Sequence, residues 1–236
     1  PTCRLQKGIV YMQLFYTPDH ARVGDVIPYY ENGEFKLFYL KNWNPYFGSD
    51  KTYGWHLLTT KDLIHYESET AIGILGGTGC IIKVEGLYHL YYCVFEDQPQ
   101  RQYVCHATST DLTNWTKYPD ETFGPDESIY LLTDWRDPHV IWNEEEKCWW
   151  MILCAQNQGN TKRRGCVGLC KSADLHHWTC CEPLYAPQSS MSAYECPDLF
   201  YMNGWWYLVF SQFTDRFQTL YRMSRSCNGP WIRPKT

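Results

Sequence analysis

Aromatic and aliphatic residues along this chain gather in short runs separated by polar turns, and no window shows helical periodicity. Four runs follow a polar or glycine turn, and each is succeeded by a second apolar run. The pairs are "ENGEFKLFYL" with "GWHLLTTKDLIHYE", "VEGLYHLYYCVF" with "YVCHATSTDLTNWT", "NEEEKCWWMILCA" with "GCVGLCKSADLHHWT", and "MNGWWYLVFSQF" with "TLYRMSRSCNGPW". Aromatic and β-branched runs joined by Asn-Gly or Glu-Gly turns are typical of β-hairpins. The pattern predicts an all-β chain.

The paired runs form a repeat with a period of roughly 55 residues, a length typical of propeller blades. Three of the units share an Asp-Leu turn that is followed by an aromatic residue three positions after the leucine. These turns are Asp62-Leu63, Asp111-Leu112 and Asp174-Leu175. Four strands per unit at a fixed period predict a β-propeller. The alternative is a β-sandwich with similar hairpins, but the recurring turn favours the propeller.

Near the start of the first predicted strand of each unit, one position recurs along the chain at steps of 54, 58 and 58 residues. It is occupied by Asp25, Gly79, Asp137 and Glu195. The first strand of every propeller blade lines the central channel, so we expect the three carboxylates to converge at one end of it. Crowded carboxylates raise one another's pKa, which suits a Ca²⁺ site or a glycoside hydrolase. A strand-end cap is the structural alternative for each acid.

The segments "WRDPHVIW", "ECPDLF" and "FYTPDHARVGDVIPYYENGEFKLFYL" resemble the motifs of glycoside hydrolase family 32, the invertase, inulinase and levanase group. The resemblance implies a five-bladed propeller, of which about four blades are evident, and a retaining mechanism. It makes Asp25 the nucleophile, Asp137 the transition-state stabiliser and Glu195 the acid/base. Arg136 and Asp137 would hold sugar hydroxyls. It implies no cofactor, and we expect no metal on these acids because Arg136 already supplies positive charge.

The first motif departs from the family pattern. Residues 24–28 read Gly-Asp-Val-Ile-Pro where the family has Asn-Asp-Pro-Asn-Gly, so the asparagines that bind the fructosyl ring are absent. Trp55 and Asn44 fall near other family landmarks. We expect residues 1–236 to form a single catalytic propeller domain from a longer protein, because one blade and the family's C-terminal sandwich are missing.

Further pocket residues follow from propeller topology. The second strand of each blade runs back toward the acids, so its end and the following loop are expected beside them. Aromatic rings stack on sugar faces, and amides or acids bind hydroxyls. The nominated substrate-binding residues are Trp43, Asn44, Phe95, Asp97, Gln156, Asn157 and Gln212.

Composition narrows the partners. No apolar stretch reaches 18 residues, which predicts no membrane span, and a net charge of −5 without a basic stripe argues against nucleic acid. The 12 cysteines show no Cys-x-x-Cys or His-rich spacing, which favours structural thiols over a disulfide framework or zinc. We therefore expect a reducing cytoplasm, or secretion if a signal peptide has been removed.

Three functions fit these residues. The first is a retaining hydrolase of β-fructofuranosides or related furanosides, with an oligosaccharide or polysaccharide as substrate. The second is an inverting hydrolase of the arabinanase or xylosidase type, and the third is a non-catalytic carbohydrate-binding propeller. Carboxyl groups about 5–5.5 Å apart indicate retention, and roughly 6.5–9.5 Å indicates inversion. The sugar, the linkage and the oligomeric state stay open.

Overall fold

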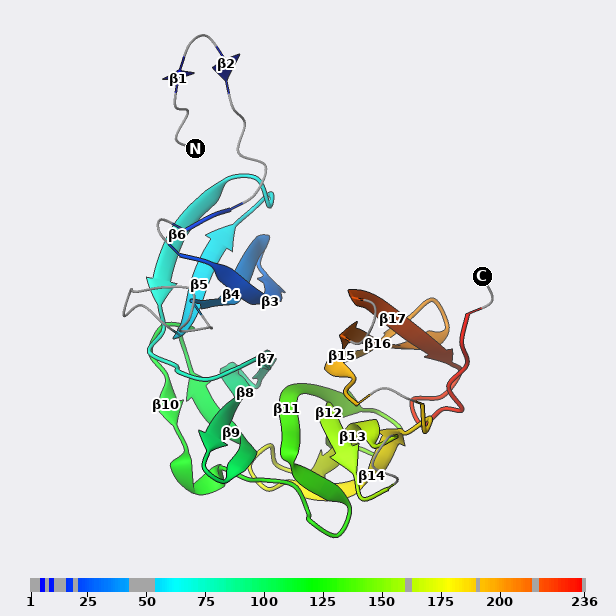
Figure 1. Ribbon diagram of the computed structural model, residues 1–236. Coiled ribbons are helices and arrows are strands. Elements are labelled where there is room, and N and C mark those ends of the chain that lie inside the picture. The colour runs from blue at the N-terminus through cyan, green and yellow to red at the C-terminus, as the bar shows by residue number, and fades with distance from the viewer. Residues whose placement is uncertain are drawn as a thin grey trace. The chain divides into compact units, whose positions relative to one another are not determined.

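The computed structural model describes residues 5–6, 9–10, 16–18, 21–42, 54–159, 163–189, 192–213 and 217–234. Within these residues the only helix is a 3₁₀ turn at Pro119–Glu121, and the remaining regular structure is strand (Figure 1). The all-β prediction is confirmed. No helix in the described part of the chain has the length and apolar character needed to cross a membrane.

The chain divides into two compact units. Unit 1 comprises residues 1–75, 86–88 and 109–115, and unit 2 comprises residues 76–85, 89–108 and 116–236. Each unit is built from sheets whose strands follow one another along the chain. That the whole of residues 1–236 forms one domain stays a prediction.

Unit 1 holds the first antiparallel sheet. Its strands are β3 (Val23–Glu31), β4 (Glu34–Lys41), β5 (Gly54–Thr60) and β6 (Tyr66–Ala71), after a small hairpin of β1 (Leu5–Gln6) and β2 (Ile9–Val10). Asn32 and Gly33 join β3 to β4 with φ of 54° and 81°. Positive φ at both central residues is the type I′ geometry that Asn-Gly turns favour.

Unit 2 holds most of the next three sheets. Their strands are β7 (Gly79–Val84), β8 (Leu87–Asp97), β9 (Gln100–Ser109) and β10 (Thr116–Lys117); β11 (Tyr130–Asn143), β12 (Cys148–Asn157), β13 (Gly165–Ser172) and β14 (Thr179–Tyr185); and β15 (Glu195–Met202), β16 (Trp205–Phe213) and β17 (Phe217–Ser224). The last sheet has three strands where four were expected, and a single bridge, Met223 to Ile232, extends it.

The first strands of successive sheets lie side by side in unit 2. β11 contacts β7 on one side and β15 on the other. First strands that neighbour one another in this way are typical of blades around a propeller channel. The predicted propeller architecture is confirmed.

The Asp-Leu turns share one hydrogen-bonding scheme. In the turn after β9, Ser109 Oγ accepts the backbone N–H groups of Asp111 and Leu112 at 3.1 and 2.9 Å. Asp111 Oδ1 accepts those of Thr113 and Asn114, both at 2.8 Å. The leucine has φ of 67°, and the same scheme recurs in residues 60–65 and 172–177. The recurring aspartates are turn formers.

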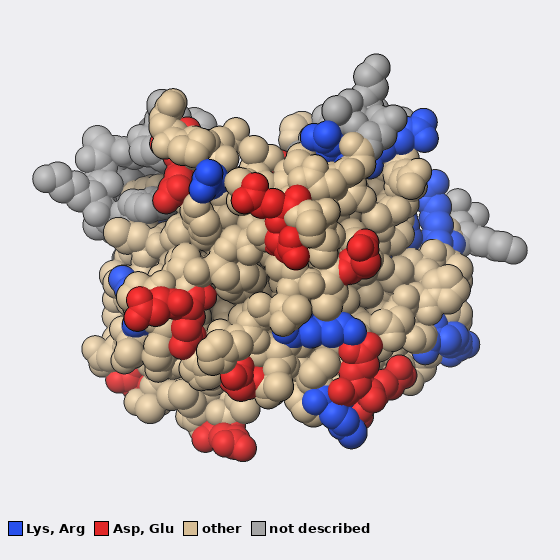
Figure 2. All heavy atoms as spheres, turned by 90° about the horizontal axis from the view of Figure 1, so that it is seen from below, with Lys and Arg blue, Asp and Glu red and all other residues tan. Residues whose placement is uncertain are grey.

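Charged side chains of both signs mix on the surface. On the face that Figure 2 shows, Lys and Arg lie next to Asp and Glu rather than in one broad patch. Ion pairs contribute to this mixing, as between Lys171 Nζ and Glu146 at 2.5 Å. Exposed pairs of this kind contribute about 0–1 kcal/mol each, so burial rather than surface charge must stabilise the sheets.

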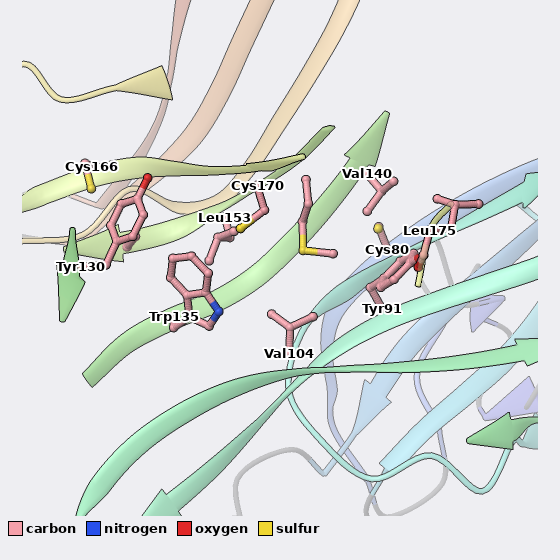
Figure 3. Packing of buried hydrophobic residues seen from close by; sticks show 12 residues of the cluster. Cys80, Tyr91, Val104, Tyr130, Trp135, Val140, Leu153, Cys166, Cys170 and Leu175 are labelled. Carbon is pink, nitrogen blue, oxygen red and sulfur yellow. The ribbon is translucent and has the colours of Figure 1, made fainter. Parts of the chain in front are cut away.

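The main core of unit 2 packs the β7–β10 sheet against the β11–β14 sheet. Figure 3 shows side chains from both sheets converging, with Tyr91 and Val104 from the first and Trp135 and Leu153 from the second. Trp135 has no exposed surface, and its replacement by Ala is expected to cost about 3–5 kcal/mol. The Tyr91 hydroxyl donates to the carbonyl of Leu175 at 2.7 Å, which adds a polar tie between the sheets.

A β-bulge interrupts β3 and β15 near their starts and β11 near its middle. The register slips between Gly24 and Ile27, between Arg136 and His139, and between Glu195 and Asp198. The residue inside each bulge has positive φ, and these residues are Asp25 (37°), Asp137 (57°) and Cys196 (46°). Bulges change the direction in which side chains point, and they are frequent next to active sites.

The bulges correct one predicted equivalence. Spacing by residue number aligned Glu195 with Asp137, but the strand register pairs Arg136 with Cys154 and Glu195 with Ser211 as the last regular pair before each bulge. Glu195 therefore corresponds to Arg136, and Cys196 corresponds to Asp137. The step of 58 residues was misleading, because the register places Cys196, which is 59 residues after Asp137, at the equivalent position.

Candidate active site

The bulges of β11 and β15 bring Asp137 and Glu195 together in unit 2. Asp137 is buried at 7% exposed, and its Oδ2 accepts the backbone N–H of Cys196 at 3.0 Å. The Cys196 thiol lies 3.7 Å from the same oxygen. The positive φ of Cys196 allows its N–H to point at the neighbouring strand, which fixes the Asp137 carboxylate next to the residue that follows Glu195.

Arg136 links the acids of this cluster. Its Nη2 donates to Glu195 Oε1 at 2.7 Å, and its Nη1 donates to Asp134 Oδ1 at 2.7 Å. Its Nε lies 3.9 Å from Asp137 Oδ2. The planar guanidinium can address several carboxylates at once because its donors point in fixed directions.

Support for Arg136 comes from the neighbouring sheet. Gln102 on β9 is buried, and its Oε1 accepts the N–H of Trp135 at 2.8 Å and a bond from Arg136 Nη1 at 3.3 Å. Burial alone would lower the pKa of Arg136, but the thiol of Cys154 and the carboxylates around it raise that pKa above its ordinary value. One guanidinium therefore serves three carboxyl groups in this cluster.

Asp25, the predicted nucleophile, lies in unit 1. It occupies the bulge of β3, and its side chain is exposed. It shares its backbone conformation with Asp137 but is followed by Val26 rather than by proline. Its catalytic role stays a prediction.

The other nominated residues have varied surroundings. Trp43 and Asn44 lie outside the described residues. Trp55 is buried at 1% exposed in unit 1, where its backbone N–H donates to Ile74, and sugar contact by its ring stays a prediction. Phe95 and Asp97 are exposed at the end of β8.

The nominated amides lie near the ends of the second strands, as the topology predicted. Gln156 and Asn157 follow Ala155, the partner of Trp135, and both are half-buried. Gln212 follows Ser211, the partner of Glu195, and accepts a bond from Gln218 at 3.3 Å. Their contact with substrate is untested.

We call Arg136 and the residues around it, Gln102, Asp134, Asp137, Glu195 and Cys196, the Arg136 cluster. Three of these residues were not predicted. Asp134 had a signal, because residues two apart on a strand face the same side and Asp134 precedes Arg136 by two positions. Cys196 could have been found by aligning the bulges instead of the residue numbers. Gln102 had no local signal, since it reaches the cluster from another sheet.

Two further features could bind ligands. A hollow of about 330 Å³ in unit 1 is lined by residues that include Glu31, Lys61 and Tyr88, and none of the predicted site residues lines it. Among the described residues, His106, Glu121 and His176 in unit 2 form a group that could hold a metal ion.

The curated relatives of this chain have names that refer to fructose-containing sugars. It is 30% identical to the sucrose-6-phosphate hydrolase of Escherichia coli over 174 residues, covering 66% of this chain and 34% of that protein. It is 25% identical to the levanbiose-producing levanase of Bacillus subtilis (strain 168) over 240 residues, covering 94% and 42% respectively. The chain therefore spans less than half the length of these relatives.

Solved structures share the fold. A Bombyx mori GH32 beta-fructofuranosidase mutant in complex with sucrose superposes with a TM-score of 0.66 at 24% identity, over 87% of this chain and 48% of that one. Bacillus subtilis levansucrase superposes with a TM-score of 0.71 at 15% identity, over 91% and 71% respectively.

The family model for the N-terminal domain of glycosyl hydrolases family 32 matches residues 26–228. The match begins one residue after Asp25 and includes Arg136, Asp137 and Glu195. It covers most of the chain, and it agrees with the motifs around these residues and with the propeller architecture. This chain belongs to glycosyl hydrolase family 32.

Proposed function

We propose that this chain is the propeller part of a retaining hydrolase of β-fructofuranosides. The observation that carries the proposal is the Arg136 cluster, in which one guanidinium lies within 3.9 Å of carboxylate oxygens from both Asp137 and Glu195. Family membership and relatives named for sucrose 6-phosphate and levan support a fructoside as substrate.

In the first step Asp25 attacks the anomeric carbon. The bond from this carbon to the leaving oxygen breaks, and Glu195 gives its proton to that oxygen. Asp137 is held by the Cys196 N–H and accepts hydrogen bonds from sugar hydroxyls, which strengthen as positive charge develops on the ring.

In the second step a water molecule attacks the same carbon. Glu195 takes a proton from this water, and the ester bond between Asp25 and the sugar breaks, which returns Asp25 to its carboxylate form. Arg136 holds the Glu195 carboxylate through Oε1 in this state, so the general base stays oriented toward the site.

The cellular setting is part of the proposal. The 11 cysteines in the described part of the chain are free thiols, a pattern that supports a reducing cytoplasm. The substrate would be an oligosaccharide or polysaccharide that contains a neutral or phosphorylated fructoside.

The test compares Glu195→Gln with Asp25→Asn in the purified protein. Glu195→Gln should lower hydrolysis of a natural fructoside by about 10²–10⁴-fold, and an aryl fructoside with a good leaving group should be affected less in the first step. Azide should restore turnover of this variant by replacing the activated water. Asp25→Asn should lose activity on both substrates without rescue. Glu182→Gln, on the exposed face of β14, is the matched control and should behave as the wild type.

The anomeric configuration of the first-formed product, followed by NMR, tests the mechanism. Retention supports the double displacement. Inversion would overturn it in favour of direct attack by water. Full activity of a folded Glu195→Gln variant would remove Glu195 from the mechanism.

A further inference from the structure

A second polar cluster lies in unit 2, outside the chemistry described above. His106 on β9 is buried at 3% exposed, and its Nδ1 lies 2.6 Å from Glu121 Oε2. The other oxygen of Glu121 lies 2.8 Å from His176 Nδ1. Glu121 belongs to the 3₁₀ turn between the β7–β10 and β11–β14 sheets, and His176 belongs to the turn after β13.

At the positions of His106 and His176, the other repeat units have no histidine. His106 lies three residues before Ser109, the serine of its Asp-Leu turn. The same position in the other two units holds a buried leucine, Leu57 or Leu169. Two residues after the turn aspartate, Ile64 and Thr113 occupy the position of His176. A buried imidazole costs free energy unless its nitrogens are satisfied, so a histidine at a leucine position calls for a specific partner.

The donor atoms have the composition and spacing of a zinc site. One ligand atom from each of His106, Glu121 and His176 lies within 4.8 Å of the other two, and Nδ1 of both histidines faces the Glu121 carboxylate. Bonds of 2.0–2.2 Å to a tetrahedral Zn²⁺ require ligand atoms about 3.4 Å apart, so side-chain shifts of about 1 Å would admit the ion. Two imidazoles and one carboxylate are a known zinc ligand set that leaves the fourth position to water.

The surroundings of His106 suit a metal ligand. Its ring stacks on Tyr91 at 4.6 Å between centroids with an interplanar angle of 5°, which fixes the direction of Nδ1. Its Nε2 lies 3.0 Å from Nδ1 of His89, which is also buried. With a metal on Nδ1, the Nε2–H of His106 can donate to His89, and hydrogen-bonded neighbours of this kind orient metal-binding histidines.

An ion can reach the cluster from solvent. The side chains of His176 and Glu121 are 35% and 21% exposed, so the site is closed on the His106 side and open on the other. We propose that His106, Glu121 and His176 bind one Zn²⁺ with water as the fourth ligand, and that the ion clamps the β7–β10 sheet to the β11–β14 sheet.

This site escapes sequence inspection because its ligands come from three separate segments. The expectation of no zinc was based on the absence of closely spaced cysteines and histidines. In this protein the folding of the sheets, rather than a short spacing in the sequence, brings the three side chains together.

The test is a calorimetric titration of tag-free, EDTA-treated protein with Zn²⁺ alone. The wild type should bind one equivalent, and His176→Ala and Glu121→Gln should each bind at least about tenfold more weakly. His177→Ala is the matched control, because His177 follows His176 in the same turn but pairs with Asp174. It should bind as the wild type does. Circular dichroism confirms that each variant is folded, and His106→Ala is avoided because the residue is buried.

Co²⁺ substitution separates this site from the cysteines. Cobalt bound by imidazole and carboxylate should give visible d–d bands without a thiolate charge-transfer band in the near ultraviolet. No binding by the wild type, equal affinity in all four proteins, or a thiolate band would overturn the proposal.

Discussion

The outer Asp-Leu turns and the inner-strand bulges are both repeated in successive sheets, but they repeat in different ways. Asp62, Asp111 and Asp174 occupy the same position and accept the same backbone hydrogen bonds in every case. The bulges repeat their backbone conformation while their residue pairs change from Gly-Asp to Arg-Asp to Glu-Cys. The Asp-Leu turns keep both their side chains and their backbone, which indicates a structural role. The bulges keep their backbone but vary their side chains, which indicates a site whose residues have different functions.

Of the two repeated features, the bulge of β11 should have the larger effect on stability. Arg136→Met leaves three carboxylates without their common cation and is expected to lower the free energy of unfolding by about 3 kcal/mol, measured by chemical denaturation. Asp134→Asn in the same background should recover part of the loss because it removes one uncompensated charge. An Arg136→Met variant as stable as the wild type would show that the cluster does not stabilise this strand pair.

A smaller effect should come from the turn after β9. Ser109→Ala removes the acceptor for the N–H of Leu112, a residue that is 2% exposed, and should lower the free energy of unfolding by about 1 kcal/mol. Thr113→Ala, in the same turn and exposed, serves as the control and should change it little. Catalytic activity should be the same in both variants. A selective loss of activity in Ser109→Ala would contradict the structural role of the turns.

The smallest effect should depend on pH. The side chain and backbone of His177 donate to Asp174 and hold its pKa well below the ordinary value of 3.8. A carboxyl with a lowered folded-state pKa stabilises the protein above its unfolded pKa, and this contribution is lost as the pH falls through the folded value. Asp174→Asn should therefore be less stable than the wild type at pH 6 by about 0.5 kcal/mol, because the pair is exposed. The difference should shrink steadily below about pH 4 in acid-unfolding curves, and a constant difference would contradict the assignment.

Sequence alone predicted the strands, the hairpin turns and the propeller, because each of these depends on local pattern and on a repeat. It also selected Arg136, Asp137 and Glu195 from short motifs, and the structure brings these three side chains together, while their roles in catalysis stay predictions. It misaligned Glu195 by one residue because a step counted in residue numbers does not show which residue of each strand lies inside the bulge.

What the sequence did not predict depends on contacts between sheets. Gln102 reaches Arg136 from β9, and His106, Glu121 and His176 meet only when two sheets pack. Such contacts are set by the twist and approach of neighbouring sheets, which no window of the sequence contains. Asp134 is the exception, since its two-residue offset from Arg136 was visible.

The hydrogen bond from the Tyr91 hydroxyl to the carbonyl of Leu175 bears on how the molecule opens. Tyr91 is in the β7–β10 sheet, and Leu175 is in the turn at the end of β13. The turn cannot swing outward while this bond holds, and Tyr91 cannot leave its place without exposing the core shared by both sheets. The two sheets should therefore open together as one cooperative unit, so that amide hydrogens of an outer turn exchange as slowly as those of buried strands.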